Sequence, residues 1–255
     1  MKRFATNELA IFALAVQFLT RFPVPVGDSY TPARLAAGPR YYPLVGALVG
    51  AACAFVYLLT ENTFTAPLAV VLALGAGLLF TGAFHEDGLA DTFDGIGGNS
   101  RERALEIMRD SRLGTYGTLA LCVVLAAKVA ALLAMPPARV AMMMVVAHTL
   151  SRLSAVLVMA SSQYVRDHGT GKPTADGIGA GGLTVAVLTC VLVLGWVVMA
   201  RGVTAALCVV AGTLLGHLFM RSLFERRLGG YTGDTLGAVQ QMSELGAYLG
   251  FLAWL

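Results

Sequence analysis

The residues best suited to chemistry are acidic and lie close together in the chain. Seven of the fifteen acidic residues occur between positions 86 and 110: Glu86, Asp87, Asp91, Asp94, Glu102, Glu106 and Asp110. On a helix, Asp87, Asp91 and Asp94 follow the spacing i, i+4, i+7 and project from one face. Carboxylates grouped in this way repel one another, so a cation should compensate them. Mg²⁺ takes oxygen ligands and bridges to substrate phosphates, and the spacing therefore predicts a magnesium site in which Mn²⁺ can substitute.

A second short helix is expected after the first. Ser100 can cap a helix whose body runs from Arg103 to Asp110, with Glu106 and Asp110 facing the first helix at i, i+4. Two opposed acidic faces can hold two metal ions about 4 Å apart, which suits an in-line displacement at phosphorus. A solvated acidic loop is the alternative, but it does not explain the helical spacing. The predicted ligands are Asp87, Asp91, Asp94, Glu106 and Asp110.

Arginines are the expected phosphate contacts, because the guanidinium group pairs with phosphate through two hydrogen bonds. Arg109 and Arg112 flank Asp110 and are the first candidates, although they can instead pair with the carboxylates. Arg152 lies in an apolar run, where charge is costly and usually functional. With His148 one turn away, it is expected either to reach the site or to form a structural ion pair.

Three further residues are candidates with a simpler alternative. Thr232 and Asp234 stand where the last helix begins, so they either cap that helix or lie near an anionic substrate. His85 precedes the acidic residues and is a candidate general base, a role that one of the aspartates can also fill. The role of Lys128 is left open.

Composition determines the elements that must position these residues. The chain is 57% hydrophobic and 13% charged, whereas soluble domains are about a quarter charged. We therefore expect an all-α polytopic membrane helix bundle, a single domain over residues 1–255 with its acidic segment at 85–114. The net charge of +3 includes no basic stripe of the kind that binds nucleic acid. Residues 9–20 are expected to form an interfacial or re-entrant helix. Seven transmembrane helices are predicted at 43–60, 66–84, 115–135, 140–161, 183–200, 203–220 and 235–255.

Several motifs together resemble one enzyme family. HEDGLADTFDG at 85–95, EIMRDSRLGTYG at 106–117 and GGYTGDTLGA at 229–238 are similar to the cobalamin synthase family, the adenosylcobinamide-GDP ribazoletransferases. FLTRFPVP at 18–25 and YPLVG at 42–46 match the N-terminal pattern of that family, so the resemblance extends over the whole chain. Glu86 departs from the pattern, which often has an apolar residue there, and the departure concerns only the local charge.

The resemblance implies a specific reaction and location. The ribose 3'-hydroxyl of α-ribazole, or of its 5'-phosphate, attacks the cobinamide-linked phosphate of adenosylcobinamide-GDP and GMP leaves, giving adenosylcobalamin or its 5'-phosphate. The resemblance also implies magnesium and a multi-pass protein of the cell inner membrane whose active site faces the cytoplasm. Substrate identity follows from the resemblance alone, and the oligomeric state is left open.

Two other functions fit parts of the sequence. Asp91-x-x-Asp94-Gly95 is similar to the first half of the motif of CDP-alcohol phosphotransferases. The second half departs, because Glu106 and Asp110 lack the expected glycine. A cation transporter should place its acidic residues near the bilayer midplane on broken helices, whereas here they cluster at one end of the predicted helices.

The first testable prediction concerns orientation. If the segment before residue 43 is cytoplasmic, fourteen lysines and arginines fall in cytoplasmic segments and only Arg139 and Arg201 fall outside. Residues 85–114, 162–182 and 221–234 should therefore face the cytoplasm and the C-terminus the other side. The test is labelling of single cysteines, introduced into a cysteine-free variant, by an impermeant maleimide added to intact cells. Labelling within 85–114 before lysis contradicts the prediction.

Overall fold

The computed structural model describes residues 2–110, 112–166 and 178–255, and the regular elements of that part of the chain are helical. Tyr164 and Tyr231 form an isolated parallel β-bridge. Two short 3₁₀ helices, η1 (Gly27–Ser29) and η2 (Gly38–Tyr41), flank α2. The α-helices are α1 (Lys2–Leu19), α2 (Pro32–Ala37), α3 (Tyr42–Thr60), α4 (Ala66–Thr81), α5 (Phe84–Ile96), α6 (Arg101–Ile107), α7 (Thr115–Leu133), α8 (Pro137–Ser161), α9 (Ala180–Arg201), α10 (Val203–Leu228) and α11 (Gly233–Trp254).

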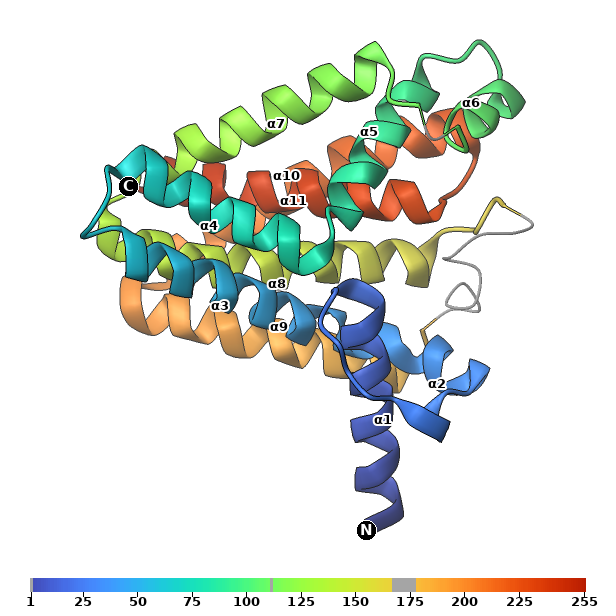
Figure 1. The fold of residues 1–255 in the computed structure, drawn as a ribbon, viewed down its shortest axis with the longest axis horizontal. Helices are drawn as coiled ribbons and strands as arrows, with labels where there is room; N and C mark the ends of the chain where they lie inside the picture. Colours follow the sequence, from blue (N-terminus) through green and yellow to red (C-terminus); the bar gives the residue numbers. More distant parts are fainter. Residues whose placement is uncertain (1, 111, 167–177) are drawn as a thin grey trace.

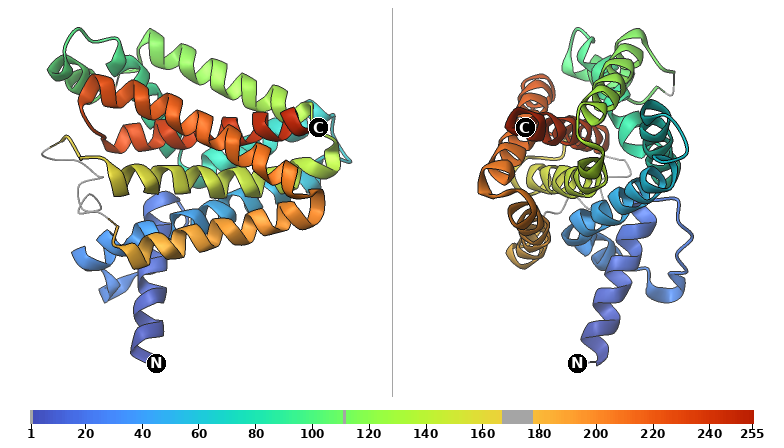
Figure 2. Two further views of the ribbon diagram at one scale, coloured as in Figure 1. Left: turned by 180° about the vertical axis from the view of Figure 1, so that it is seen from behind. Right: turned by 90° about the vertical axis from the view of Figure 1, so that its left-hand side faces the viewer.

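The long helices form one bundle around α8. The end-on view in Figure 2 shows α8 surrounded by α3, α9, α10 and α11, and α8 contacts all four. A helix in that position is buried on every side, and α8 is accordingly the most buried of the candidate membrane spans. The outer helices instead expose large apolar side chains, such as Leu192 and Met199 on α9. The surface of the bundle therefore suits lipid.

The predicted spans agree with the helices within a few residues, with two differences. Five helical segments are long and apolar enough to cross a membrane by themselves, and a sixth is obtained if α4 and α5 count as one broken span. The seventh expected span, α11, has the required length but carries Gln240, Gln241 and Glu244, which lower its hydropathy. The second difference is in α10, which continues to Leu228 rather than ending near residue 220.

The chain breaks sharply between α4 and α5. The axes of these helices differ by 88°, and the turn is made by Gly82 (φ 67°) and Ala83 (φ 54°), both in the left-handed region. The backbone N–H of Arg21 donates to the carbonyl of Phe80 just before the break, and a Cβ on Gly82 would collide with the Arg21 side chain. The break turns α5 out of the direction of α4 and across the ends of α7 and α11 (Figure 1).

Helix α1 runs across the direction of the bundle rather than along it (Figure 1). Its apolar stretch Thr6–Leu19 is shorter than a membrane span. Leu14 and Ala15 are buried, whereas Leu9 is 68% exposed. This geometry agrees with the expected interfacial helix, which begins earlier than residue 9.

The polar connections gather at one end of the bundle. In Figure 1, α2, α5, α6, the start of α9 and the junction of α10 with α11 all lie at the same end, and the C-terminus lies at the other. The segments that carry most of the predicted cytoplasmic charge therefore share one face of the protein.

The break at Gly82 predicts a loss of stability on substitution. Gly82→Ala should lower the free energy of unfolding by about 1–2 kcal/mol, because alanine is strained at positive φ and its Cβ meets Arg21. The matched control is Gly75→Ala within α4, where a Cβ meets nothing within 4 Å and stability should hold or rise slightly. Unfolding in mixed detergent micelles measures both variants. Equal stability of the two contradicts the strain argument.

Candidate active site

The acidic helix α5 packs unusually close to the start of α11. A Cβ on Gly88 would lie 2.6 Å from the carbonyl oxygen of Asp234, and a Cβ on Gly237 would lie 2.9 Å from the carbonyl oxygen of His85. Only glycine permits this approach from both helices. The glycines of two sequence motifs, at 85–95 and 229–238, thus bring the two motifs into direct contact.

Asp87 and Asp91 are carboxylates without a partner. Neither side chain has a hydrogen bond or ion pair with any of the described residues, and Asp91 lies within the electrostatic influence of Asp234, Asp87 and Asp94, with Arg166 as the opposing charge. Asp94 differs, because it accepts hydrogen bonds from the backbone N–H groups of Gly114 and Gly117, both at 2.8 Å. The three aspartates do lie on one helix, as the spacing predicted.

The second acidic helix is only partly as predicted. Ser100 caps α6 and accepts from the N–H of Arg103, as expected. The helix ends at Ile107, however, so Asp110 lies beyond it and does not share a helical face with Glu106. The physical reason is local: Asp110 accepts from the backbone N–H and the guanidinium of Arg112, a turn interaction that competes with helix continuation.

The side chains of this second segment are engaged at the surface. Glu106 pairs with Arg103 at 2.7 Å, and the hydrogen bonds from Arg112 lower the pKa of the Asp110 carboxyl to about 2. Both carboxylates nevertheless line one surface hollow together with Asp94. Arg112 therefore pairs with a carboxylate, which was the alternative to a phosphate contact. Arg109 is exposed, and its guanidinium has no ion pair with a described residue.

Arg166 is a site residue that the sequence did not reveal. Its guanidinium lies 2.7 Å from the Asp234 carboxylate and donates to the carbonyl of Met108 at 3.3 Å. The β-bridge positions it, because the N–H of Val165 donates to Tyr231 and the N–H of Tyr231 donates to Gln163. In the sequence Arg166 was only one of many charges in a loop, and nothing there indicated its pairing with residue 234.

Thr232 is a helix cap. It is fully buried, and its hydroxyl and backbone form a capping box with Thr235 at the start of α11. Its side chain also lies 3.5 Å from the Asp234 carboxylate. Thr232 thus fixes the position of Asp234, which is the simpler of the two readings.

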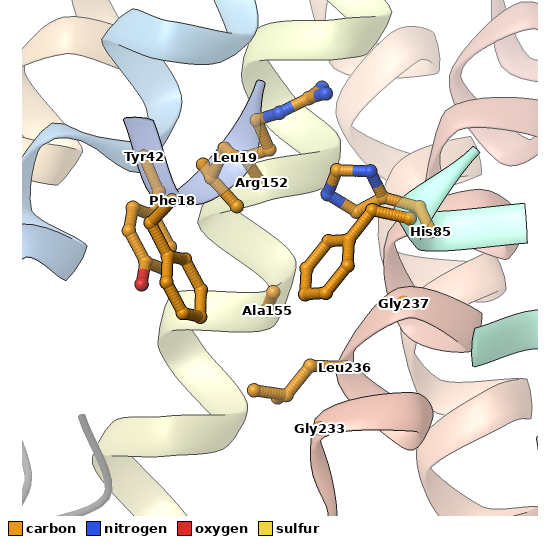
Figure 3. Close-up of a pocket in the computed structure, with 10 residues that line it drawn as sticks. Phe18, Leu19, Tyr42, His85, Arg152, Ala155, Gly233, Leu236 and Gly237 are labelled. Carbon is orange, nitrogen blue, oxygen red and sulfur yellow. The ribbon is translucent and has the colours of Figure 1, made fainter. Parts of the chain in front are cut away.

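His85 and Arg152 lie in a different place from the aspartates. Both are buried and line a pocket, here called the aromatic pocket, beside the start of α5 (Figure 3). His85 and Asp87 are two positions apart, so they point to nearly opposite sides of α5. The pocket is lined by Phe18, Leu19, Tyr42, Phe84, His85, Arg152, Ala155, Gly233, Leu236 and Gly237.

A buried network of charged and polar side chains adjoins this pocket at His85 and Arg152. Lys128 on α7 is 2.9 Å from Glu244 on α11 and also donates to Gln241 at 2.7 Å. Both members of the ion pair are at most 2% exposed. Gln240 donates to Glu244 and to Ser151 of α8, and Gln241 donates to Glu86 of α5, each between 2.8 and 2.9 Å.

Arg152 joins the same region through His148. One terminal guanidinium nitrogen donates to the His148 carbonyl at 3.0 Å, and His148 Nδ1 is 3.6 Å from the Glu244 carboxylate. Glu244, Gln240 and Gln241 were not identified from sequence. The sequence did contain a signal: three polar residues at i, i+1 and i+4 lie inside an expected span, and membrane helices rarely carry such residues without a function.

The predicted metal ligands fit a cation site only in part. Within residues 2–110, 112–166 and 178–255, no three His, Cys, Asp or Glu side chains converge closely enough to hold a metal ion. The donor chemistry still fits a hard cation, because Asp87 and Asp91 are oxygen donors whose charge no described residue pairs. Glu106 and Asp110 fit less well, because each already pairs with an arginine.

The fold and the site define a class: a polytopic membrane helix bundle with an acidic helix and several arginines at one end. The family model described as cobalamin-5-phosphate synthase matches residues 11–252. The chain therefore belongs to the cobalamin-5-phosphate synthase family, which confirms the resemblance found in the sequence. No solved structure matches the chain.

Curated relatives cover nearly the whole chain. A protein of Leptothrix cholodnii named adenosylcobinamide-GDP ribazoletransferase is 44% identical over 97% of this chain and 96% of its own length. Proteins of the same name from Shewanella woodyi and Vibrio cholerae are each 42% identical, over 97% of this chain and 97% and 95% of their own lengths. The match thus includes every predicted site residue.

The Arg166–Asp234 pair predicts a measurable coupling. The Arg166 side chain is 10% exposed and that of Asp234 is 21% exposed, so a double-mutant cycle of Arg166→Gln and Asp234→Asn should give about 1–2 kcal/mol of coupling in stability. The Arg112–Asp110 pair is the matched control, because Arg112 is 88% exposed and such pairs contribute little. Unfolding in detergent micelles measures both cycles. Equal coupling in the two cycles is the outcome that contradicts this account.

Proposed function

We propose that this protein joins α-ribazole, or its 5'-phosphate, to adenosylcobinamide-GDP in a magnesium-dependent reaction that releases GMP. The observation that carries the proposal is the family match over residues 11–252. It agrees with the names of the relatives, whose lengths are almost fully covered. The acidic helix at one end of a membrane bundle supports the chemistry, because phosphate transfer needs cations and fixed charges at the reacting group.

The bond changes are those of a single displacement at phosphorus. The ribose hydroxyl oxygen forms a bond to the cobinamide-linked phosphorus, the bond from that phosphorus to the bridging oxygen of the diphosphate breaks, and GMP leaves. The proton of the hydroxyl passes to a base. The unpaired carboxylates Asp87 and Asp91 suit that role better than His85, which lies on the buried side of α5.

The remaining residues have positioning and binding roles in this proposal. Asp87, Asp91 and Asp94 would hold Mg²⁺. Glu106 and Asp110 could join them as ligands if Arg103 and Arg112 release these carboxylates and bind the substrate phosphate instead. The ion supplies charge neutralisation at the transferring phosphate. Arg109 and Arg112 contact phosphate oxygens from the exposed side, and Arg166 holds Asp234 in place.

The proposed location is the cell inner membrane. The apolar helices support a multi-pass membrane protein, and we place it in the cell inner membrane with the acidic end toward the cytoplasm. The distribution of lysine and arginine supports this orientation, because the positive segments lie at the acidic end (Figure 1).

The CDP-alcohol phosphotransferase alternative is not favoured. Its motif has a glycine before the second acidic pair, which this sequence lacks at Glu106 and Asp110, and α6 ends at Ile107, before Asp110. The family match and the curated relatives all point to corrinoid chemistry. A transporter is not supported either, because the unpaired carboxylates Asp87 and Asp91 lie on α5 at one end of the bundle.

Removing charge from α5 should abolish turnover. Asp87→Asn and Asp91→Asn should each lower the rate of GMP release by about a hundredfold or more, because fixed charge at a transferring phosphate contributes on the order of 3 kcal/mol. The assay follows GMP release from adenosylcobinamide-GDP with α-ribazole, using protein purified in lipid. A chelator should stop the reaction, and added Mg²⁺ or Mn²⁺ should restore it.

The control is Glu102→Gln, an exposed residue in the first turn of α6, which should keep the wild-type rate. Retention of full activity in both aspartate variants would show that the proposed carboxylates are wrong. Consumption of a CDP-activated lipid in place of the corrinoid would replace the proposed function itself.

A further inference from the structure

The aromatic pocket has a chemical character that differs from the acidic site beside it. Its walls carry the rings of Phe18, Tyr42 and Phe84; Phe18 and Tyr42 are stacked, with centroids 6.0 Å apart, and Phe84 meets Phe18 edge to face at 5.8 Å. Figure 3 shows Phe18 and Tyr42 on one side of the pocket, His85 on the opposite side, and Arg152 of α8 at its upper end. The Phe84 ring meets the His85 ring edge to face, with centroids 5.4 Å apart. Flat aromatic ligands stack on such rings.

Arg152 provides the polar end of the pocket. It is 2% exposed, and its Nε–H has no hydrogen-bond partner among the described residues. One terminal nitrogen is already held by His148. A buried donor without an acceptor is unfavourable. Arg152 lines both the aromatic pocket and the adjoining cavity of the charged network, so a ligand in the aromatic pocket can supply the missing acceptor.

The combination restricts the ligand. An acyl chain would fill the apolar walls but would leave the Arg152 donor unsatisfied. A phosphate would satisfy Arg152 but would lose its hydration among aromatic rings. A flat heteroaromatic ring with an acceptor nitrogen in its plane satisfies both the walls and the donor.

We propose that the aromatic pocket binds the benzimidazole base of the acceptor nucleoside, with the ring nitrogen that is not bonded to ribose facing Arg152 and His85. This inference rests on the proposed function and assigns the place of one of its two substrates. It also changes the expected role of Arg152, which contacts the base rather than the diphosphate.

The pocket is adjacent to the carboxylates. Phe18 and Phe84 also line a neighbouring hollow that includes Asp87, and Gly233 in the pocket wall directly precedes Asp234. In this proposal the ribose of a bound base extends past Phe18 and Phe84 toward the hollow that includes Asp87. The attacking hydroxyl would then lie on the side of the unpaired carboxylates.

The first test reduces the size of the pocket. Ala155 lies in its wall on α8 and is 8% exposed, so Ala155→Leu should disfavour large bases. The measurement is kcat/KM for the ribosides of dimethylbenzimidazole and of unsubstituted benzimidazole, with adenosylcobinamide-GDP held constant. The ratio should shift about tenfold toward the smaller base. Because the ratio is taken within each variant, a smaller folded fraction does not change it.

The matched control is Ala160→Leu, an exposed position on the same helix, which should leave the ratio unchanged. A second variant, Phe18→Leu, removes a ring from the wall and should raise the KM for α-ribazole about tenfold without changing the KM for adenosylcobinamide-GDP. Equilibrium dialysis of α-ribazole without the corrinoid should show the same weakening. An unchanged ratio in Ala155→Leu together with unchanged α-ribazole binding in Phe18→Leu overturns the proposal.

The last test addresses the polar contact. The wild-type protein should prefer the riboside of benzimidazole over that of indole, which has a C–H in place of the acceptor nitrogen, and Arg152→Gln should reduce that preference at least tenfold. If Arg152→Gln instead raises only the KM for adenosylcobinamide-GDP, Arg152 contacts the diphosphate and the proposal is wrong. Absence of GMP release by the wild-type protein would refute the proposed function, whereas the dialysis of α-ribazole would still test the pocket.

Discussion

The ion pair between Lys128 and Glu244 is the constraint on which the arrangement of the bundle depends. Both groups are removed from water, and separating them would leave an unpaired charge in a membrane interior at a high free-energy cost. The glutamines that complete the hydrogen bonds of Glu244 and Lys128 extend the network to α8 and α5. Four helices are thereby held in one register, and that register places the start of α5 beside the start of α11.

Close packing through glycine then determines where the carboxylates lie. Gly88 and Gly237 allow α5 and α11 to touch through their backbones, so Asp91 comes within the electrostatic influence of Asp234. Bulky residues at these positions would move the acidic helix away from α11 and would break the Gln241–Glu86 hydrogen bond that joins α5 to the interior network. The glycines therefore determine how closely the two motifs at 85–95 and 229–238 approach each other.

Much of this arrangement follows from sequence, and the rest required long-range contacts. Apolar runs and helical spacing were sufficient for the spans and for the shared helix of Asp87, Asp91 and Asp94, because both are local properties. The end of α6 before Asp110 depended on a side-chain turn with Arg112 that competes with the helix. The pairings of Lys128 with Glu244 and of Arg166 with Asp234 join residues more than sixty positions apart, which spacing along one chain does not encode.

The position of Glu244 near the end of the chain has a consequence for biosynthesis. The cations Lys128 and Arg152 enter the membrane with α7 and α8, long before the ribosome has made α11. Until that last helix arrives, the growing protein holds two basic side chains without their anionic partner, and the wall of the aromatic pocket formed by Leu236 and Gly237 is missing. Chains truncated before α11 would lack both the anionic partner of Lys128 and part of the pocket wall, and docking of α11 supplies both in a single step.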